Sequence, residues 1–176
     1  MSKYFLYVGN AYPHKNLKRL FEAVKGLNEN LEEKVILKVV SSKNVFLKRL
    51  EKKKNEYVEL LGFVPEDKLK SLYKNSLAFV FPSLSEGFGL PGIEAMEAGT
   101  LVLASDIPVF REIYQDAAIY FNPYDFSSIQ KSLENAVGMS EEIRNEKIAY
   151  SQKFIKRYSW EKMAKETLKI YLMFRP

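Results

Sequence analysis

Short apolar runs alternate along most of the chain with segments in which apolar residues recur every three or four positions. The runs are rich in β-branched and aromatic residues, as buried parallel strands are. They predict strands over residues 4–8, 35–40, 57–61, 77–81, 101–105 and 118–121. The periodic segments predict helices over residues 17–27, 45–54, 66–75, 91–99, 109–114, 125–137, 141–157 and 160–173. This alternation predicts an α/β fold: a Rossmann-like, doubly wound parallel sheet of about six strands, with helices on both faces and further helices at the C-terminus.

Some residues are expected to fix the ends or the packing of these helices. Asn16 is a candidate N-cap for the helix that begins at Leu17, and Ser159 is a candidate for the last helix, because both side chains accept hydrogen bonds from free N–H groups. Val45, Phe46 and Leu50 are expected to face inward, and Trp160 is expected to be a packing residue.

The composition indicates a single domain over residues 1–176. The chain has 47% hydrophobic and 28% charged residues, which is ordinary for a globular protein long enough to bury a core. It has no cysteine, which excludes disulfides and thiolate metal sites. No apolar run approaches the ~20 residues of a membrane span, and no signal peptide is expected at the N-terminus.

The net charge of +5 would suit an anionic ligand, an anionic membrane surface or nucleic acid. Much of this charge lies at Lys48, Arg49, Lys52, Lys53 and Lys54. No aromatic residue is interleaved with these cations, so we interpret the run as the solvated face of a helix and expect no nucleic-acid partner.

One stretch, residues 82–99, joins the fourth predicted strand to a helix through a glycine-rich loop. Pro91 suits the first turn of that helix, and Gly99 suits the left-handed position that ends it. The loop therefore aims backbone N–H groups, at the positive end of a helix dipole, above the strand. Gly87 and Gly89 would let a bulky anion approach the main chain closely.

Two carboxylates bracket this loop. Glu86 precedes the glycines, and Glu94 is expected in the first turn of the helix, where it can simply favour the helix dipole. Acidic residues beside a dinucleotide loop, however, commonly accept hydrogen bonds from ribose hydroxyls. The pair therefore suggests a nucleotide-sugar site, in which the loop backbone binds the diphosphate, one carboxylate binds the ribose and the other binds the sugar.

The expected sheet order, 3-2-1-4-5-6, places strands one and four side by side, and ligands bind in the crevice between their carboxyl ends. The loop after strand one, residues 9–16, should then face residues 83–90. Lys15 would lie opposite the glycines, where an ammonium group complements the backbone donors of a diphosphate site. A solvated loop lysine is the alternative.

Both loops resemble the donor-site motifs of the retaining glycosyltransferases of family 4, also called glycosyl transferases group 1. Residues 86–94, Glu-Gly-Phe-Gly-Leu-Pro-Gly-Ile-Glu, are similar to the family's Glu-x7-Glu signature. Residues 7–17, Tyr-Val-Gly-x4-His-Lys-Asn-Leu, are similar to its first donor-site motif. Family members have two facing Rossmann-like domains, the GT-B architecture. The resemblance covers only the C-terminal, donor-binding domain, over about residues 3–174.

The resemblance implies a donor site made by both loops and by the end of the third strand. Its implied residues are Gly9, Asn10, Lys15, Phe63, Val64, Glu86, Gly87, Phe88, Gly89, Leu90 and Glu94. Lys15 and Glu86 are the implied catalytic residues: Lys15 binds the diphosphate, and Glu86 holds hydroxyls of the transferred sugar. Glu94 holds the ribose.

Two parts of this site leave alternatives open. Asn10 stands where many members carry an arginine, which leaves one cation fewer. His14 is a candidate to compensate, and an exposed loop histidine is the alternative. Phe63 and Val64 would contact the nucleotide base, or Phe63 would instead plug the core. No metal or other cofactor is implied, because Lys15 and the helix dipole supply the positive charge.

The resemblance implies an enzyme of polysaccharide biosynthesis that transfers a hexose from a nucleotide-sugar to a glycan or lipid-linked acceptor. The Pro-His-Lys-Asn form of residues 13–16 favours GDP-mannose as the donor. The acceptor-binding domain, expected to be absent or on a partner chain, would be needed for activity. A cytoplasmic location is expected, with peripheral membrane association of the full enzyme allowed. A non-catalytic nucleotide or nucleotide-sugar binding module is the alternative; a dehydrogenase is disfavoured, because no Gly-x-Gly-x-x-Gly follows strand one.

Overall fold

The computed structural model describes residues 3–174 and contains one six-stranded parallel sheet of order β3-β2-β1-β4-β5-β6. The strands are β1 (Tyr4–Val8), β2 (Ile36–Val40), β3 (Val58–Gly62), β4 (Ala78–Phe81), β5 (Val102–Ser105) and β6 (Ile119–Phe121). Each lies within one residue of its predicted span. The doubly wound α/β fold is therefore confirmed, with β1 and β4 paired at its centre.

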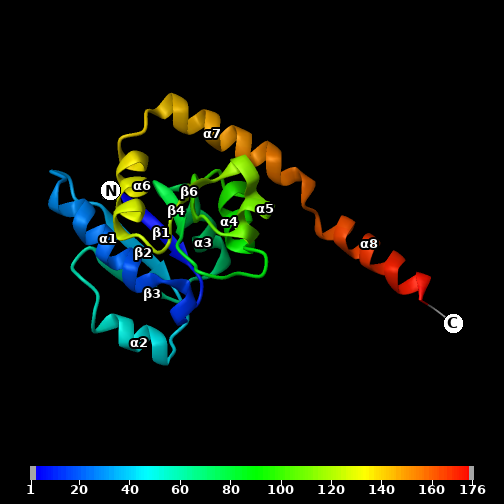
Figure 1. Ribbon diagram of the computed structural model, residues 1–176, viewed down its shortest axis with the longest axis horizontal. Coiled ribbons are helices and arrows are strands. Elements are labelled where there is room, and N and C mark those ends of the chain that lie inside the picture. The colour runs from blue at the N-terminus through cyan, green and yellow to red at the C-terminus, as the bar shows by residue number, and fades with distance from the viewer. Residues whose placement is uncertain (1–2, 175–176) are drawn as a thin grey trace.

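Helices cover both faces of the sheet (Figure 1). One face carries α1 (Leu17–Glu29), α2 (Val45–Glu51) and α6 (Phe126–Val137). The other face carries α3 (Glu66–Lys74), α4 (Leu90–Glu97) and α5 (Pro108–Tyr114). Short 3-10 turns follow β1 at Pro13–Lys15 and α5 at Gln115–Ala117.

The sheet has a hydrophobic core on each of its two faces, and alternate residues of each central strand pack into one core or the other. Phe5 and Tyr7 of β1 pack with α1 and α6, whereas Leu6 between them packs with α4 and α5. All three side chains are fully buried. Successive strand residues point to opposite faces, so a strand covered on both sides must be apolar throughout. This is why the strands could be recognised as continuous apolar runs.

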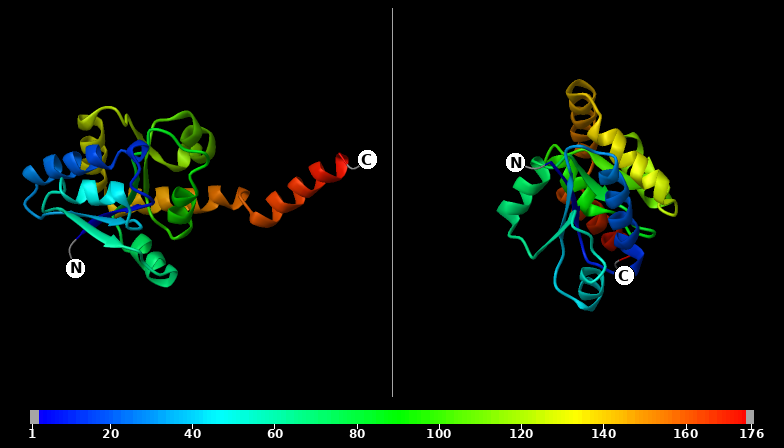
Figure 2. Two further views of the ribbon diagram at one scale, coloured as in Figure 1. Left: turned by 90° about the horizontal axis from the view of Figure 1, so that it is seen from below. Right: turned by 90° about the vertical axis from the view of Figure 1, so that its left-hand side faces the viewer.

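The C-terminal part consists of α7 (Glu141–Phe154), a 3-10 turn (Ile155–Arg157) and α8 (Trp160–Met173). Arg144 anchors α7, because its guanidinium donates to the backbone carbonyls of Leu77 and Ala136. Helix α8 projects away from the body of the domain (Figures 1 and 2). Trp160 is consequently 70% exposed, so the prediction that it is a packing residue is wrong. Ser159 does cap α8, as predicted, by accepting from the N–H of Lys162.

Helix α2 is shorter than predicted, and Phe46 and Leu50 pack against the core as predicted, whereas Val45 does not. The side chain of Asn44 caps it by accepting from the N–H of Leu47, and the helix ends at Glu51. In this register Leu47 is buried, whereas Val45 is 62% exposed, which corrects the inward assignment of Val45. Among residues 3–174, the helices are too short or too polar for any of them to cross a bilayer.

Candidate functional site

The loops after β1 and β4 lie against each other at the carboxyl ends of the central strands. The backbone N–H of Leu84 donates to the carbonyl of His14 over 2.8 Å. The two segments are thus joined by a main-chain hydrogen bond, although neither belongs to the sheet at this point. This is the juxtaposition that the sheet order predicts.

Lys15 and Glu86 form an ion pair across this contact. Nζ of Lys15 lies 2.5 Å from Oε1 of Glu86, and the two side chains are only 12% and 11% exposed. The ammonium also lies 5.6 Å from the centre of the Phe81 ring, the last residue of β4. The structure therefore excludes the solvated loop lysine and brings together the two residues that sequence motifs single out.

A hydrogen bond from Tyr114 of α5 holds the backbone of the glycine loop. Its hydroxyl donates to the carbonyl of Gly89 over 2.5 Å. A Cβ at Gly89 would lie 2.2 Å from that hydroxyl, and one at Gly92 would lie 2.3 Å from it. Gly89 also adopts a left-handed φ of +96°. The position of the Tyr114 hydroxyl therefore requires glycine at both positions. Burial raises the pKa of Tyr114 well above its usual range, so its hydroxyl stays protonated and can donate.

The N-terminus of α4 points out of this loop. Gly89 is its N-cap, Pro91 lies in its first turn, and Gly99, with φ +76°, follows its end in the left-handed conformation, as predicted. Gly87 is exposed, and a Cβ there would have open space around it. Phe88 in the loop and Leu90, the first residue of α4, are both exposed on either side of the N-cap. The positive end of the helix dipole is thus accessible from solvent.

Glu94 lies just beyond the first turn of α4, and not within it as predicted. The helix begins at Leu90, so Glu94 is its fifth residue and not part of its first turn. Its carboxylate accepts a hydrogen bond of 3.3 Å from the hydroxyl of Tyr73, a buried residue of α3. Burial, followed by the nearby charge of Glu94, raises the pKa of Tyr73 well above its usual range. The phenol therefore remains a donor that orients the carboxylate.

The loop after β1, residues 9–16, is shaped by hydrogen bonds within it and to β2. Gly9 has a φ of +149° and donates its N–H to the carbonyl of Val40 at the end of β2. The side-chain oxygen of Asn10 accepts from the N–H of Tyr12, and its carbonyl accepts from the hydroxyl of Tyr7. Asn10 therefore closes a local turn. His14 is exposed, and its contribution to the loop is the carbonyl that Leu84 bonds.

The end of β3 presents an aromatic side chain to solvent. Phe63 is 81% exposed, so the alternative that it plugs the core is wrong. Val64 is partly buried against the core beneath α4 and α5. The turn between strand and helix depends on Gly62, whose φ is +71°. Phe63 and Val64 thus lie at the same edge of the sheet as the two loops.

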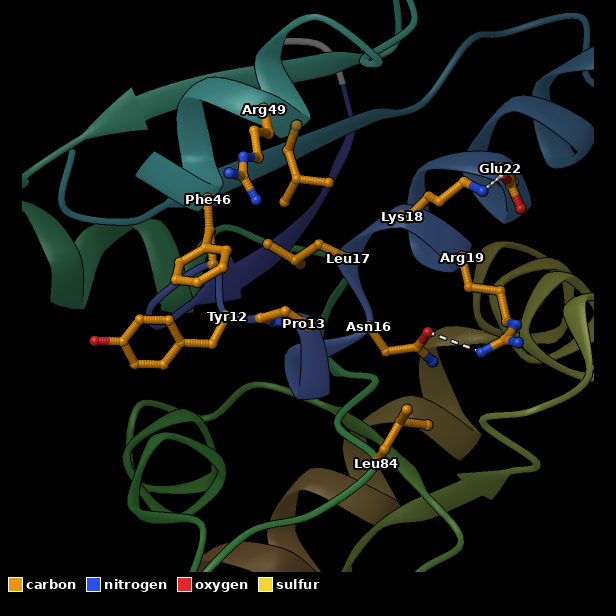
Figure 3. Close-up of a pocket in the computed structure, with 12 residues that line it drawn as sticks. Tyr12, Pro13, Asn16, Leu17, Lys18, Arg19, Glu22, Phe46, Arg49 and Leu84 are labelled. Carbon is orange, nitrogen blue, oxygen red and sulfur yellow. Dashed lines mark hydrogen bonds and ion pairs between the residues drawn. The ribbon is translucent and has the colours of Figure 1, made fainter. Parts of the chain in front are cut away.

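A separate cavity of about 490 Å³ lies on the other side of the β1–α1 turn, between α1 and α2 (Figure 3). Its walls include Tyr12, Leu17, Phe46, Arg49 and Leu84. None of the eleven residues of the predicted donor site, all within residues 3–174, lines it. The predicted donor-site residues follow β1, β3 and β4 instead, at the carboxyl ends of these strands. Within the same described range, no cluster of three or more His, Cys, Asp or Glu side chains is placed to hold a metal ion.

Residues 1–154 match the family model described as glycosyl transferases group 1. The chain belongs to this family. It is similar to the O-antigen chain mannosyltransferase RfbU of Salmonella typhimurium, with 33% identity over 91% of the chain and 44% of that protein. It is 30% identical to O-antigen chain mannosyltransferase B of Escherichia coli, over 96% of the chain and 45% of that protein. The chain thus spans less than half the length of these relatives.

Solved structures show the same fold in one half of larger proteins. Sucrose-phosphate synthase from Thermosynechococcus elongatus superposes with a TM-score of 0.82 at 20% identity, over 98% of this chain and 45% of that one. An E. coli structure described as trehalose-6-phosphate bound with UDP-2-fluoro glucose gives 0.83 at 18% identity, over 96% and 44%. The chain therefore belongs to the glycosyl transferases group 1 family and has the fold of one half of these larger proteins.

Proposed function

We propose that this chain binds the donor of a hexosyltransferase and that GDP-mannose is the donor it takes. The observation that carries the proposal is the Lys15–Glu86 pair, 2.5 Å apart beside the open N-terminus of α4. A cation, free N–H groups and a carboxylate are the groups that a sugar diphosphate needs. The cation and the N–H groups bind its phosphates, and the carboxylate accepts from its sugar hydroxyls.

The roles follow from the chemistry of each group. As the bond between the sugar and the diphosphate breaks, negative charge grows on the phosphate oxygens. Lys15 and the N–H groups of the glycine loop stabilise that charge, so no metal is required at this position. Glu86 holds the transferred sugar through its hydroxyls, and Glu94, oriented by Tyr73, holds the ribose.

The remaining donor-site residues surround these groups. Gly9 and Asn10 shape the first loop, and Gly87 and Gly89 allow the diphosphate to approach the second. The apolar residues Phe88 and Leu90 border the sugar, and Phe63 and Val64 border the base. The preference for GDP-mannose rests on residues 13–16, Pro-His-Lys-Asn, and on the names of the two O-antigen relatives, both of which are mannosyltransferases.

Transfer is proposed to require a second, acceptor-binding domain, since the relatives are more than twice as long as the matched region. Helix α8 offers a surface for it: Leu168, Ile170, Tyr171 and Met173 are each more than half exposed. The acceptor would be a glycan or a lipid-linked glycan, handled at the cytoplasmic side of a membrane. By themselves, residues 1–176 should bind a nucleoside diphosphate weakly and transfer nothing, because one domain supplies only one wall of a cleft that excludes water.

A thermal-shift panel of GDP, UDP, ADP and their sugars tests donor binding, because a ligand that binds only the folded state raises the melting temperature. GDP and GDP-mannose should give the largest shifts, and Lys15→Met should reduce them. A larger shift with UDP or ADP would overturn the donor assignment, and no shift with any nucleotide would overturn the site.

Assays with radiolabelled GDP-mannose separate an enzyme from a binding module. Transfer only after addition of the acceptor-binding domain supports the proposal. Donor binding without transfer in either case would show a non-catalytic nucleotide-sugar binding module instead.

A further inference from the structure

Asn16 is a buried polar residue that the donor-site motifs leave without a role. It follows Lys15 directly, is 8% exposed and adopts a left-handed φ of 58°. Asparagine is one of the few residues besides glycine that tolerates this conformation. It occupies the N-cap position of α1, as predicted. Its side chain makes no cap hydrogen bond within the described chain, however, and is used elsewhere.

The side-chain amide of Asn16 joins three loops. It donates over 3.1 Å to the carbonyl of Pro82, at the end of β4, and over 2.9 Å to the carbonyl of Pro123, after β6. Both N–H donors of the amide are therefore used, and both bonds are buried. The segments that they connect are 66 and 107 residues away along the chain.

Arg19, one turn further along α1, fixes the orientation of this amide. Its guanidinium donates over 3.0 Å to Oδ1 of Asn16 (Figure 3). It also donates over 3.4 Å to the carbonyl of Pro123. Arginine can only donate, so it must face the oxygen of the amide and leave the nitrogen for the two carbonyls. The Asn16 amide therefore has a single orientation that satisfies every group.

We propose that Asn16 is the positioning residue of the donor site. It fixes the distance between the chain segments that carry Lys15 and Glu86, and Arg19 supports it. Pro82 lies at the start of the loop that carries Glu86, so a bond from Asn16 to its carbonyl sets the relative placement of the two loops. A site of this kind is only as exact as the hydrogen bonds that hold its binding groups in place. The inference rests on the proposed function for the identity of the ligand. The hydrogen bonds of Asn16 do not depend on that function.

The first test uses the free protein and follows hydrogen–deuterium exchange. Asn16→Gly keeps the left-handed backbone and removes only the amide. It should speed amide exchange in residues 82–90, including the N–H of Leu84, which donates to the carbonyl of His14. Asn28→Ala is the matched control: Asn28 is a buried asparagine of the same helix, its amide bonds to Val24 and Val35, and the substitution likewise removes only the amide. Unchanged protection of residues 82–90 in Asn16→Gly would overturn the positioning role.

The second test is a double-mutant cycle with Lys15→Met, read by calorimetry with GDP and with guanosine. Asn16→Gly should weaken the binding of GDP about tenfold, which is the cost of one misplaced hydrogen bond to a charged group. It should leave the binding of guanosine unchanged. In the Lys15→Met background it should cause no further loss, because Asn16 acts through Lys15. Asn16→Asp should weaken the binding of GDP further, because it places a carboxylate against the carbonyls of Pro82 and Pro123.

The outcomes separate the inference from the function it rests on. An equal loss for GDP and guanosine, or losses that add in the double variant, would show a merely structural role. If the unaltered protein binds no nucleoside diphosphate, the proposed function fails, and the exchange measurement alone decides whether Asn16 positions the loops.

Discussion

The ammonium of Lys15 and the carboxylate of Glu86 lie 2.5 Å apart, although 71 residues separate them in the chain. Each is mostly buried, so in the absence of a ligand each satisfies the other's charge. A sugar diphosphate can place its phosphates on the ammonium and its hydroxyls on the carboxylate. Without a ligand, the pair holds both groups of the proposed site in position, and neither charge is left unpaired where it is mostly buried.

Breaking this pair should destabilise the fold. Lys15→Met is expected to lower the free energy of unfolding by about 1–3 kcal/mol, because it leaves Glu86 charged, buried and without its partner. Lys15→Met combined with Glu86→Gln should recover much of the loss. Urea denaturation of both variants measures this. The exposed pair Lys3–Glu33 is the control, and Lys3→Met should cost less than about 0.5 kcal/mol; equal losses at the two sites would contradict the prediction.

The glycines of the loop should differ sharply in their tolerance of a side chain. Gly89→Ala is expected to cost more than about 2 kcal/mol, because it combines a left-handed φ with a collision against Tyr114. Gly92→Ala meets the same hydroxyl without a left-handed φ and should also be destabilising. Gly87→Ala has open space and should stay within about 0.5 kcal/mol of the unaltered protein. Thermal unfolding of the three variants gives the order, and a tolerated Gly89→Ala would refute the role of Tyr114.

Glu94→Gln should weaken nucleoside diphosphate binding about tenfold, the worth of a charge-assisted hydrogen bond to ribose. Stability should hardly change, because Glu94 is exposed. Tyr73→Phe removes the phenol that orients the carboxylate over 3.3 Å and should give a smaller loss of affinity. Calorimetry with GDP measures both, and an unchanged affinity of Glu94→Gln would exclude Glu94 from the ribose site.

Asp106 and Arg111 predict a pH-dependent contribution to stability. Two hydrogen bonds from the guanidinium, at 2.6 and 2.7 Å, hold the pKa of Asp106 below its usual range. A lowered pKa gives stability that is fully present above the unfolded value of about 3.9 and is lost as the pH falls through the lower folded value. Because the pair is half exposed, this contribution should not exceed about 1 kcal/mol.

Arg111→Gln tests this contribution by urea unfolding. The variant should be less stable than the unaltered protein near pH 6, and the difference should shrink below about pH 4. The part that remains at low pH reports the stacking of Arg111 over the Tyr120 ring, 3.8 Å away, which does not titrate in this range. A difference that stays constant between the two pH values would show that Asp106 contributes nothing.

The elements and their order could be predicted because their physics is local. A strand buried on both faces must be apolar at every position, and proline and glycine mark where a helix can start and stop. Six strands alternating with helices leave few ways to wind a sheet, and that winding alone places Lys15 opposite the glycine loop. The meeting of Lys15 with the glycine loop could therefore be predicted before any coordinate was known.

The partners of those residues depend on tertiary structure. Tyr114 reaches Gly89 from another helix, Tyr73 reaches Glu94 from α3, and the amide of Asn16 turns from its own helix to Pro82 and Pro123. Nothing in the sequence near either member marks these pairs. The exposure of Trp160 was also misjudged, because an aromatic residue at a helix start packs only if the helix lies on the body.

The sequence by itself determined the fold, the family and the residues that meet at the carboxyl edge of the sheet. Only the tertiary structure decided how those residues are held, which glycines are obligatory and which helix leaves the domain. The physical reason is one of range: hydrophobic pattern and backbone preference act within a few residues, whereas a hydrogen bond between loops exists only once the sheet has brought them together.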